Sequence, residues 1–159
     1  MVNSHRQYIE DLAQKALDLC KCEKAPVPVE DIVEKVGLKV VPFDFPDQVS
    51  GVLKKNKKAI GVNKNHHPLR RRFTVAHELG HFLLGHEGHE DEEFVDDKFD
   101  RPYPVEREAN LFASFLLMPK KWVTESVEKN GMDVETLAKE FKVSEQAMTI
   151  RLLELNLIK

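Results

Sequence analysis

Cysteine is nearly absent from this chain, which has Cys20 and Cys22 and no other among its 159 residues. Two cysteines so close in sequence cannot form an ordinary disulfide framework. We interpret Cys20 as a core residue and Cys22 as incidental, with a pair of weak metal ligands as the alternative. Long hydrophobic runs are missing too, which argues against a membrane span. Residues 1–6 lack the apolar stretch of a signal peptide, so we expect a cytoplasmic protein with no membrane partner.

An excess of charge is also missing overall, because the net charge is only −3. Hydrophobic residues make up 42% and charged residues 32% of the chain, which is typical of a globular protein with its own core. The charges are nevertheless segregated: residues 54–72 hold eight Lys or Arg and no acid, whereas residues 87–100 hold eight Asp or Glu and one Lys. We interpret both segments as solvated loops, with a charged rim that steers a partner as the alternative.

The most informative stretch is His77-Glu78-Leu79-Gly80-His81. Residues four apart on an α-helix lie on one face, with Cβ atoms about 6 Å apart, so two imidazoles can converge there on one metal ion. Glu78 is rotated by about 100° from His77, so it would flank the metal rather than bind it. That is the place of a general base for the attacking water. The spacing predicts a metal centre at His77 and His81 with Glu78 as the catalytic base.

A third ligand is expected from the helix that begins at Pro104. Glu108 shares an apolar stripe with Leu111, Phe112 and Phe115, and a carboxylate on such a face is costly to bury unless it is paired or metal-bound. We therefore predict Glu108 as the third ligand, in preference to Glu106. The alternative role of Glu106, in the first turn, is to interact with the helix dipole.

Other side chains near the motif are weaker candidates. His86 is the rival third ligand, but its position at the end of the motif helix fits ordinary capping. His89 lies in the acidic segment. Tyr103, His66 and His67 are possible second donors to an oxyanion, and for each of them we favour no role in catalysis.

The apolar pattern predicts an α+β fold that is mostly helical. We predict one domain over residues 1–159, with N-terminal helices in 1–37, the sheet and metal site in 38–118, and C-terminal helices in 119–159. The sheet should have about three mostly antiparallel strands beside the motif helix. Its strands are expected at 38–41, 51–54 and 59–62, and an extended substrate could pair with the exposed edge of the last one.

The tail over residues 137–152 predicts a helix, a turn, and a second helix capped by Ser144, and it resembles a helix-turn-helix. The second helix carries Glu145 and Glu154 against Arg151 alone. A helix that enters the major groove of DNA is usually basic. We therefore expect a structural role for this tail and no direct binding of nucleic acid.

Two motifs resemble the ImmA/IrrE family of metallopeptidases. One is Arg72–His81 followed by Leu84-Gly85-His86, and the other is Glu106-x-Glu108-Ala109-Asn110-x-Phe112-Ala113 running into Leu116–Pro119. Together they cover roughly residues 50–120, and the tail resembles the usual C-terminal end of the family. The resemblance implies a zincin-like fold with one zinc ion per chain. It also implies that the two motif histidines and the second glutamate of the later motif, here His77, His81 and Glu108, bind the zinc.

The resemblance further implies a function. Family members use the motif glutamate, here Glu78, as catalytic base, and they cleave helix-turn-helix repressors to switch on mobile-element or stress genes. The expected activity is therefore zinc-dependent hydrolysis of a peptide bond, with a repressor as the partner protein. Two alternatives stay open: a DNA- or partner-binding regulator with a structural metal, and a non-haem Fe(II) enzyme, because two histidines and one carboxylate also suit iron.

Overall fold

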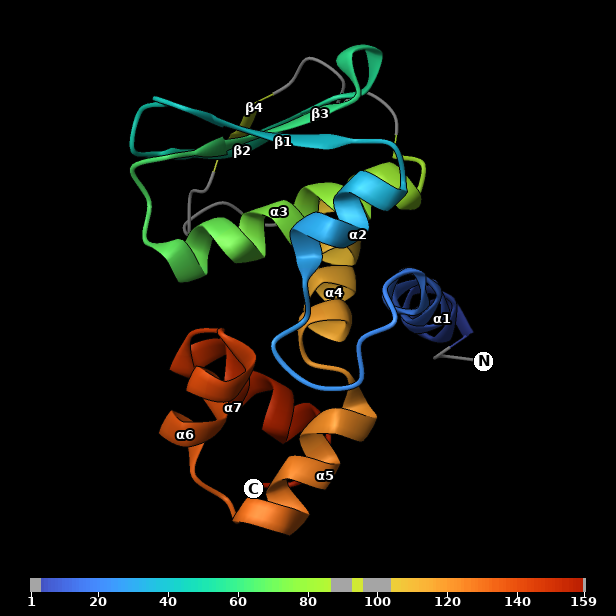
Figure 1. Ribbon diagram of the computed structural model, residues 1–159, viewed down its shortest axis with the longest axis vertical. Coiled ribbons are helices and arrows are strands. Elements are labelled where there is room, and N and C mark those ends of the chain that lie inside the picture. The colour runs from blue at the N-terminus through green and yellow to red at the C-terminus, as the bar shows by residue number, and fades with distance from the viewer. Residues whose placement is uncertain (1–3, 87–92, 96–103, 159) are drawn as a thin grey trace.

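The computed structural model describes residues 4–86, 93–95 and 104–158 (Figure 1). Seven helices and four strands lie in these ranges, together with a short 3-10 turn at Lys55–Lys57. In chain order they are α1 (Ser4–Leu19), α2 (Val29–Lys35), β1 (Lys39–Phe43), β2 (Val49–Lys54), β3 (Ala59–Asn63), α3 (Pro68–Leu83), β4 (Glu93–Val95), α4 (Pro104–Leu117), α5 (Lys120–Asn130), α6 (Val134–Phe141) and α7 (Glu145–Glu154). The predicted α+β class, mostly helical with a small sheet beside the motif helix, is confirmed.

The sheet is mixed, with strand order β1-β3-β2-β4. β2 and β3 form the predicted antiparallel hairpin, in which Gly51 lies opposite Val62. β1 instead runs parallel to β3, and β4 adds a fourth strand along β2. Because β3 has a partner on each side, its backbone offers no edge, and the expectation that a substrate pairs with residues 59–62 is wrong.

Helix α3 packs against one face of the sheet and crosses α4 (Figure 1). Pro68 stands in its first turn, and the Nδ1 atom of His67 accepts a hydrogen bond from the Leu69 backbone N–H at 3.0 Å. A Pro at the first helical position loses no hydrogen bond, because that N–H has no partner within the helix. Residues 74–81 of α3 are all buried, so the motif lies inside the molecule.

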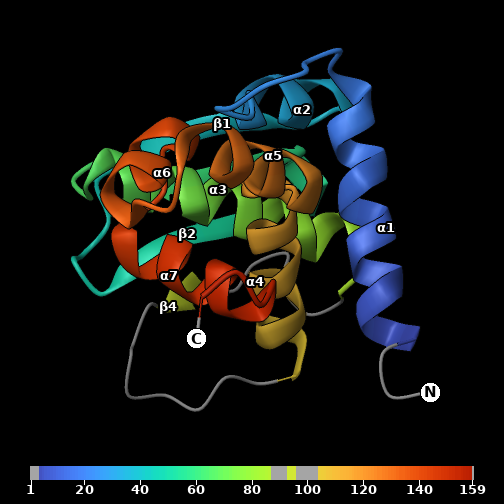
Figure 2. The same cartoon turned by 90° about the horizontal axis from the view of Figure 1, so that it is seen from below.

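The C-terminal helices gather at the end of α4 that is away from the sheet (Figures 1 and 2). Ser144 caps α7 as predicted, since its hydroxyl accepts from the Ala147 N–H at 3.0 Å. Arg151 is only 2% exposed, and its Nε–H donates to the Met118 carbonyl at 2.9 Å. The single basic residue of α7 thus ties this helix to the end of α4 and is turned away from solvent. Among the described helices, none has the length and apolar character needed to cross a bilayer.

The absence of a side chain at Gly80 lets α4 pack closely against α3. A Cβ atom at this position would lie 3.0 Å from Cδ1 and 3.1 Å from Cβ of Phe112. We predict that Gly80→Ala lowers the free energy of unfolding by about 1–3 kcal/mol through overpacking, although alanine improves helix propensity by about 1 kcal/mol. Urea unfolding measures this change. The double variant Gly80→Ala/Phe112→Leu should lose less than the sum of the two single variants. A Gly80→Ala protein as stable as the parent would contradict this account of the packing.

Candidate metal centre

The two motif histidines meet inside the protein, one helical turn apart on α3. Each is 1% exposed, and the Nε2 atoms of His77 and His81 lie 3.1 Å apart. Their rings are nearly perpendicular, at 84°. A nitrogen atom of each ring and a carboxylate oxygen of Glu78 all lie within 4.8 Å of one another. The predicted convergence of the two imidazoles is therefore present in the structure.

A carboxylate from α4 completes the set of ligand atoms, and it belongs to Glu106. Its Oε1 lies 3.0 Å from His77 Nε2, and its Oε2 lies 3.1 Å from His81 Nε2. In a tetrahedral zinc site with bonds of 2.0–2.1 Å, neighbouring ligand atoms are about 3.3 Å apart. The three side chains thus already hold the spacing of three corners of such a site, and the fourth corner lacks a protein ligand among the described residues.

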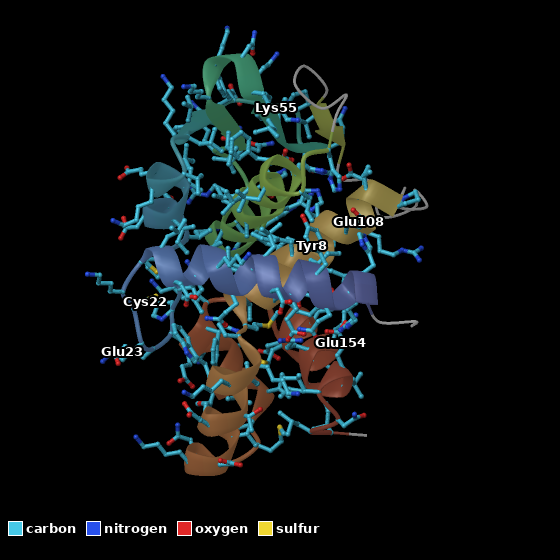
Figure 3. The ribbon with its side chains drawn as sticks, turned by 90° about the vertical axis from the view of Figure 1, so that its right-hand side faces the viewer. Tyr8, Cys22, Glu23, Lys55, Glu108 and Glu154 are labelled. Carbon is cyan, nitrogen blue, oxygen red and sulfur yellow. The ribbon has the colours of Figure 1, made fainter. Side chains whose placement is uncertain are left out.

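Glu108 lies elsewhere, which corrects the expectation that it faces the histidine pair. Its Oε1 is 2.8 Å from His86 Nε2, and its Oε2 is 2.7 Å from His5 Nε2. Figure 3 shows Glu108 on α4 beside the N-terminal part of α1. Glu106 and Glu108 are about 200° apart around the helix, so they flank its buried face from opposite sides. α3 lies on the Glu106 side, and α1 lies on the Glu108 side.

Asn110 orients the first histidine, a role that the sequence analysis missed. Its Oδ1 lies 2.7 Å from His77 Nδ1. A carbonyl oxygen can only accept, so the Nδ1–H of His77 donates and Nε2 keeps its lone pair for a metal. Asn110 stands one helical turn after Glu106, and this i, i+4 spacing was a signal that both residues face the same partner.

The second histidine is oriented by a chain of hydrogen bonds. The carboxylate of Glu108 accepts from the Nε2–H of His86, whose Nδ1 lies 2.8 Å from His81 Nδ1. A neutral imidazole that donates through Nε2 accepts through Nδ1, so the Nδ1–H of His81 donates to His86 and Nε2 is left with its lone pair. Burial also lowers the pKa of His81, which keeps the ring neutral, as a metal ligand must be. His86 and Glu108 therefore support the site from outside the ligand set.

This hydrogen bonding makes the centre a place for a cation. Two Nε2 lone pairs and the Glu106 carboxylate point toward one another at 3.0–3.1 Å. Electron pairs at this distance repel unless a proton or a metal ion lies between them. Burial works against ionisation of Glu106, but hydrogen bonds from His77 and His81, when these rings carry a proton on Nε2, outweigh burial and lower its pKa. The donor set fits Zn²⁺, which takes imidazole nitrogen and carboxylate oxygen as ligands.

Glu78 lies beside this set, under strand β2. It is 2% exposed, and its Oε2 has no hydrogen-bond partner among the described residues. Burial first, and repulsion from Glu106 second, raise the pKa of Glu78 to about 8. A Cβ atom added to Gly51 of β2 would come within 3.7 Å of Glu78 Cγ, so the bare backbone lets the sheet approach this residue closely. A buried carboxylate with a free oxygen beside a cation site is suited to hold a proton.

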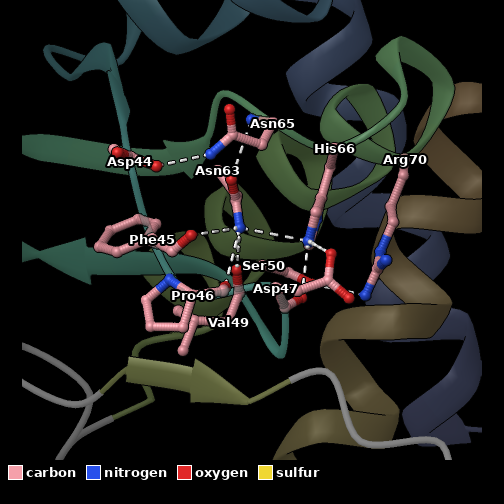
Figure 4. Close-up of polar contacts among 10 residues, drawn as sticks. All are labelled: Asp44, Phe45, Pro46, Asp47, Val49, Ser50, Asn63, Asn65, His66 and Arg70. Carbon is pink, nitrogen blue, oxygen red and sulfur yellow. Dashed lines mark hydrogen bonds and ion pairs between the residues drawn. The ribbon is translucent and has the colours of Figure 1, made fainter.

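The remaining candidates from the sequence lie away from the centre. His66 Nε2 is 2.8 Å from the Asp47 carbonyl and belongs to a polar network around Asn63, whose Nδ2 donates to the Val49 carbonyl at 2.8 Å (Figure 4). This network fixes the loop between β1 and β2. His67 caps α3, as described above. Cys20 and Cys22 contact one another, with Sγ atoms 2.7 Å apart, at the end of α1. Tyr103 and His89 lie outside the described residues.

The buried Glu78 carboxyl predicts a pH dependence for the metal-free protein. Because its pKa is about 8 in the fold and near 4.3 when unfolded, folding favours the protonated form, and stability is lost as pH rises between these values. Glu78→Gln removes that loss, so its stability relative to wild type should rise by about 1.4 kcal/mol per pH unit between about pH 5 and pH 8. Urea unfolding with a chelator present measures this difference, and Glu128→Gln, at an exposed position, is the control. Parallel pH profiles for Glu78→Gln and wild type would contradict it.

Comparisons with known proteins identify relatives of this chain. The family model for the IrrE N-terminal-like domain matches residues 33–153. The chain is 30% identical over 153 residues to the radiation response metalloprotease IrrE of Deinococcus radiodurans, covering 86% of this chain and 44% of that protein. It thus spans less than half the length of this relative.

A solved structure shows the same fold. A Mycobacterium tuberculosis transcriptional regulator superposes with a TM-score of 0.66 at 18% identity, over 92% of this chain and 46% of that one. The matched family model includes both helices that form the metal centre, α3 and α4. This protein therefore belongs to the ImmA/IrrE family.

Proposed function

We propose that this protein is a zinc-dependent endopeptidase that hydrolyses a peptide bond in a protein substrate. The observation that carries the proposal is the convergence of His77 Nε2, His81 Nε2 and the Glu106 carboxylate at 3.0–3.1 Å, with the buried Glu78 carboxylate beside them. Glu106 thereby takes the ligand role that the sequence had suggested for Glu108. Two histidines and one glutamate leave one position of a tetrahedral site for a water molecule.

Each residue then has a defined task in hydrolysis. His77, His81 and Glu106 would hold the zinc ion, which when bound supplies a Lewis acid that activates water and polarises the scissile carbonyl. Glu78 takes a proton from the attacking water and returns it to the leaving amine. Asn110 and His86 hold the two imidazoles in the tautomer that directs Nε2 to the metal. The buried position of Glu78 favours the protonated form, which makes the uptake of a proton from the attacking water easier.

The substrate we propose is a helix-turn-helix transcriptional repressor, whose cleavage would release mobile-element or stress genes. The resemblance of the two motifs to the ImmA/IrrE family supports this choice. The described residues add that the one basic residue of α7, Arg151, is buried. That burial favours recognition of the repressor protein over recognition of its DNA.

The zinc affinities of two variants distinguish the proposed roles of Glu106 and Glu108. We predict that Glu106→Gln weakens zinc binding by more than about 100-fold, because it removes a ligand, whereas Glu108→Gln weakens it by about 10-fold through the orientation of His81. Titration of metal-free protein against a chromophoric chelator measures both affinities. A larger loss in Glu108→Gln than in Glu106→Gln would contradict the ligand set.

Cleavage tests the role of Glu78. We predict that wild-type protein with zinc cuts a repressor encoded beside its gene, and that Glu78→Gln binds zinc normally but cuts at least about 100-fold more slowly. Mass spectrometry of the products measures the rate and the position of the cut. The exposed Glu128→Gln variant should cut at the wild-type rate. Equal cleavage by wild type and Glu78→Gln would show that the peptidase assignment is wrong.

A further inference from the structure

Two adjoining cavities, which we call the groove, lie between His77 and the C-terminal helices. A cavity of about 560 Å³ is lined by His77 and Asn110 of the centre, and a second, larger cavity of about 960 Å³ lies between the N-terminal part of α3 and the helices α6 and α7. The two share part of their walls, formed by Arg70, Phe73, Gln146, Ala147 and Ile150. A chain bound beside His77 would therefore lie next to the larger cavity.

The α7 residues that line both cavities are uncharged and partly apolar. Gln146, Ala147 and Ile150 line both cavities, and their spacing of one helical turn puts them on one face of the helix. Ile150 is 50% exposed, so its aliphatic side chain is available to a ligand in the groove. The basic residue of this helix, Arg151, is 2% exposed and points to the core. Across the groove, Phe73 and Leu69 add apolar surface from α3.

The charges around the larger cavity are mixed, with Arg70, Lys139 and Lys142 against Glu135 and Glu145. Lys139 of α6 forms an ion pair with Glu135 at 3.3 Å. Glu145 also lines the cavity, at the start of α7. Nucleic acid binding needs an excess of positive charge that tracks phosphates, and acidic side chains among the basic ones weaken such a surface. A ligand with apolar side chains fits these lining residues better, because it can contact the apolar ones while the charged ones stay solvated.

We propose that this groove binds apolar side chains of the protein substrate next to the peptide bond that is cut. The proposal rests on the peptidase function above, and it specifies the substrate as a segment with aliphatic or aromatic side chains on the side of the cut that faces α7. Phe73, Ala147 and Ile150 are then the residues that determine specificity. They act by contact with the substrate, and the metal centre does not depend on them.

Binding can be measured apart from cleavage. Fluorescence anisotropy with zinc-loaded Glu78→Gln protein compares a labelled ten-residue peptide containing leucine and phenylalanine with one in which serine and asparagine replace them. We expect the apolar peptide to bind at least tenfold more tightly. Adding Ile150→Glu, or Ile150→Ser as the milder change, should remove most of this preference. Adding Leu153→Glu is the matched control, because Leu153 is 45% exposed on the same helix and lines neither cavity; it should change the affinity by less than twofold.

Cleavage completes the test, with the same changes made in the active protein. Ile150→Glu should raise KM for the apolar peptide by at least tenfold with little change in kcat, while thermal unfolding and zinc content stay as in wild type. Equal effects of Ile150→Glu and Leu153→Glu, tighter binding of the polar peptide, or DNA that displaces the peptide through Ile150 would each overturn the groove assignment. Binding that depends on Ile150, with no cleavage by wild type of either peptide or of the repressor, would support the groove and overturn the peptidase function.

Discussion

The packing of α3 against α4 brings three electron-pair donors together, and the rest of the site is arranged around them. Two neutral imidazoles and one carboxylate converge at 3.0–3.1 Å in a buried place. Such an arrangement costs free energy unless a cation lies within it. The helices that impose it meet where Gly80 lets Phe112 approach. Without metal, a proton shared between these atoms would hold them together, and a metal ion could take its place.

The hydrogen bonds around the centre connect parts of the chain that are far apart in sequence. Glu108 of α4 contacts both His86, which follows α3, and His5, near the start of α1. Burial opposes ionisation of Glu108, but the hydrogen bonds from His86 and His5 outweigh it and lower its pKa. The orientation of His81 thus depends on a carboxylate that never contacts the metal position. In the proposed site, one glutamate of the α4 motif is therefore a metal ligand and the other orients a ligand.

The sequence alone predicted the motif helix, the hairpin, the Ser144 cap and the α+β class, because each rests on local spacing. The prediction of the third ligand failed because the sequence did not show which side of α4 faces the motif histidines. Glu106 and Glu108 flank the buried face of α4 on opposite sides, and only the positions of α1 and α3 decide which one meets the histidines. Asn110 was missed for the same reason. The parallel pairing of β1 with β3 and the loss of an open β3 edge are tertiary facts, and no local pattern encodes them. The burial of Arg151 is a tertiary fact too, because its partner, the Met118 carbonyl, lies 33 residues away in the sequence.

Anomalous diffraction at the zinc absorption edge tests the central claim most directly. Crystals of the zinc-loaded protein should show one strong peak within about 2.0–2.2 Å of His77 Nε2, His81 Nε2 and a carboxylate oxygen of Glu106, with Glu108 still bonded to His86. A peak coordinated by Glu108, His86 or His5 instead, or no ordered zinc between the two motif histidines, would contradict the account.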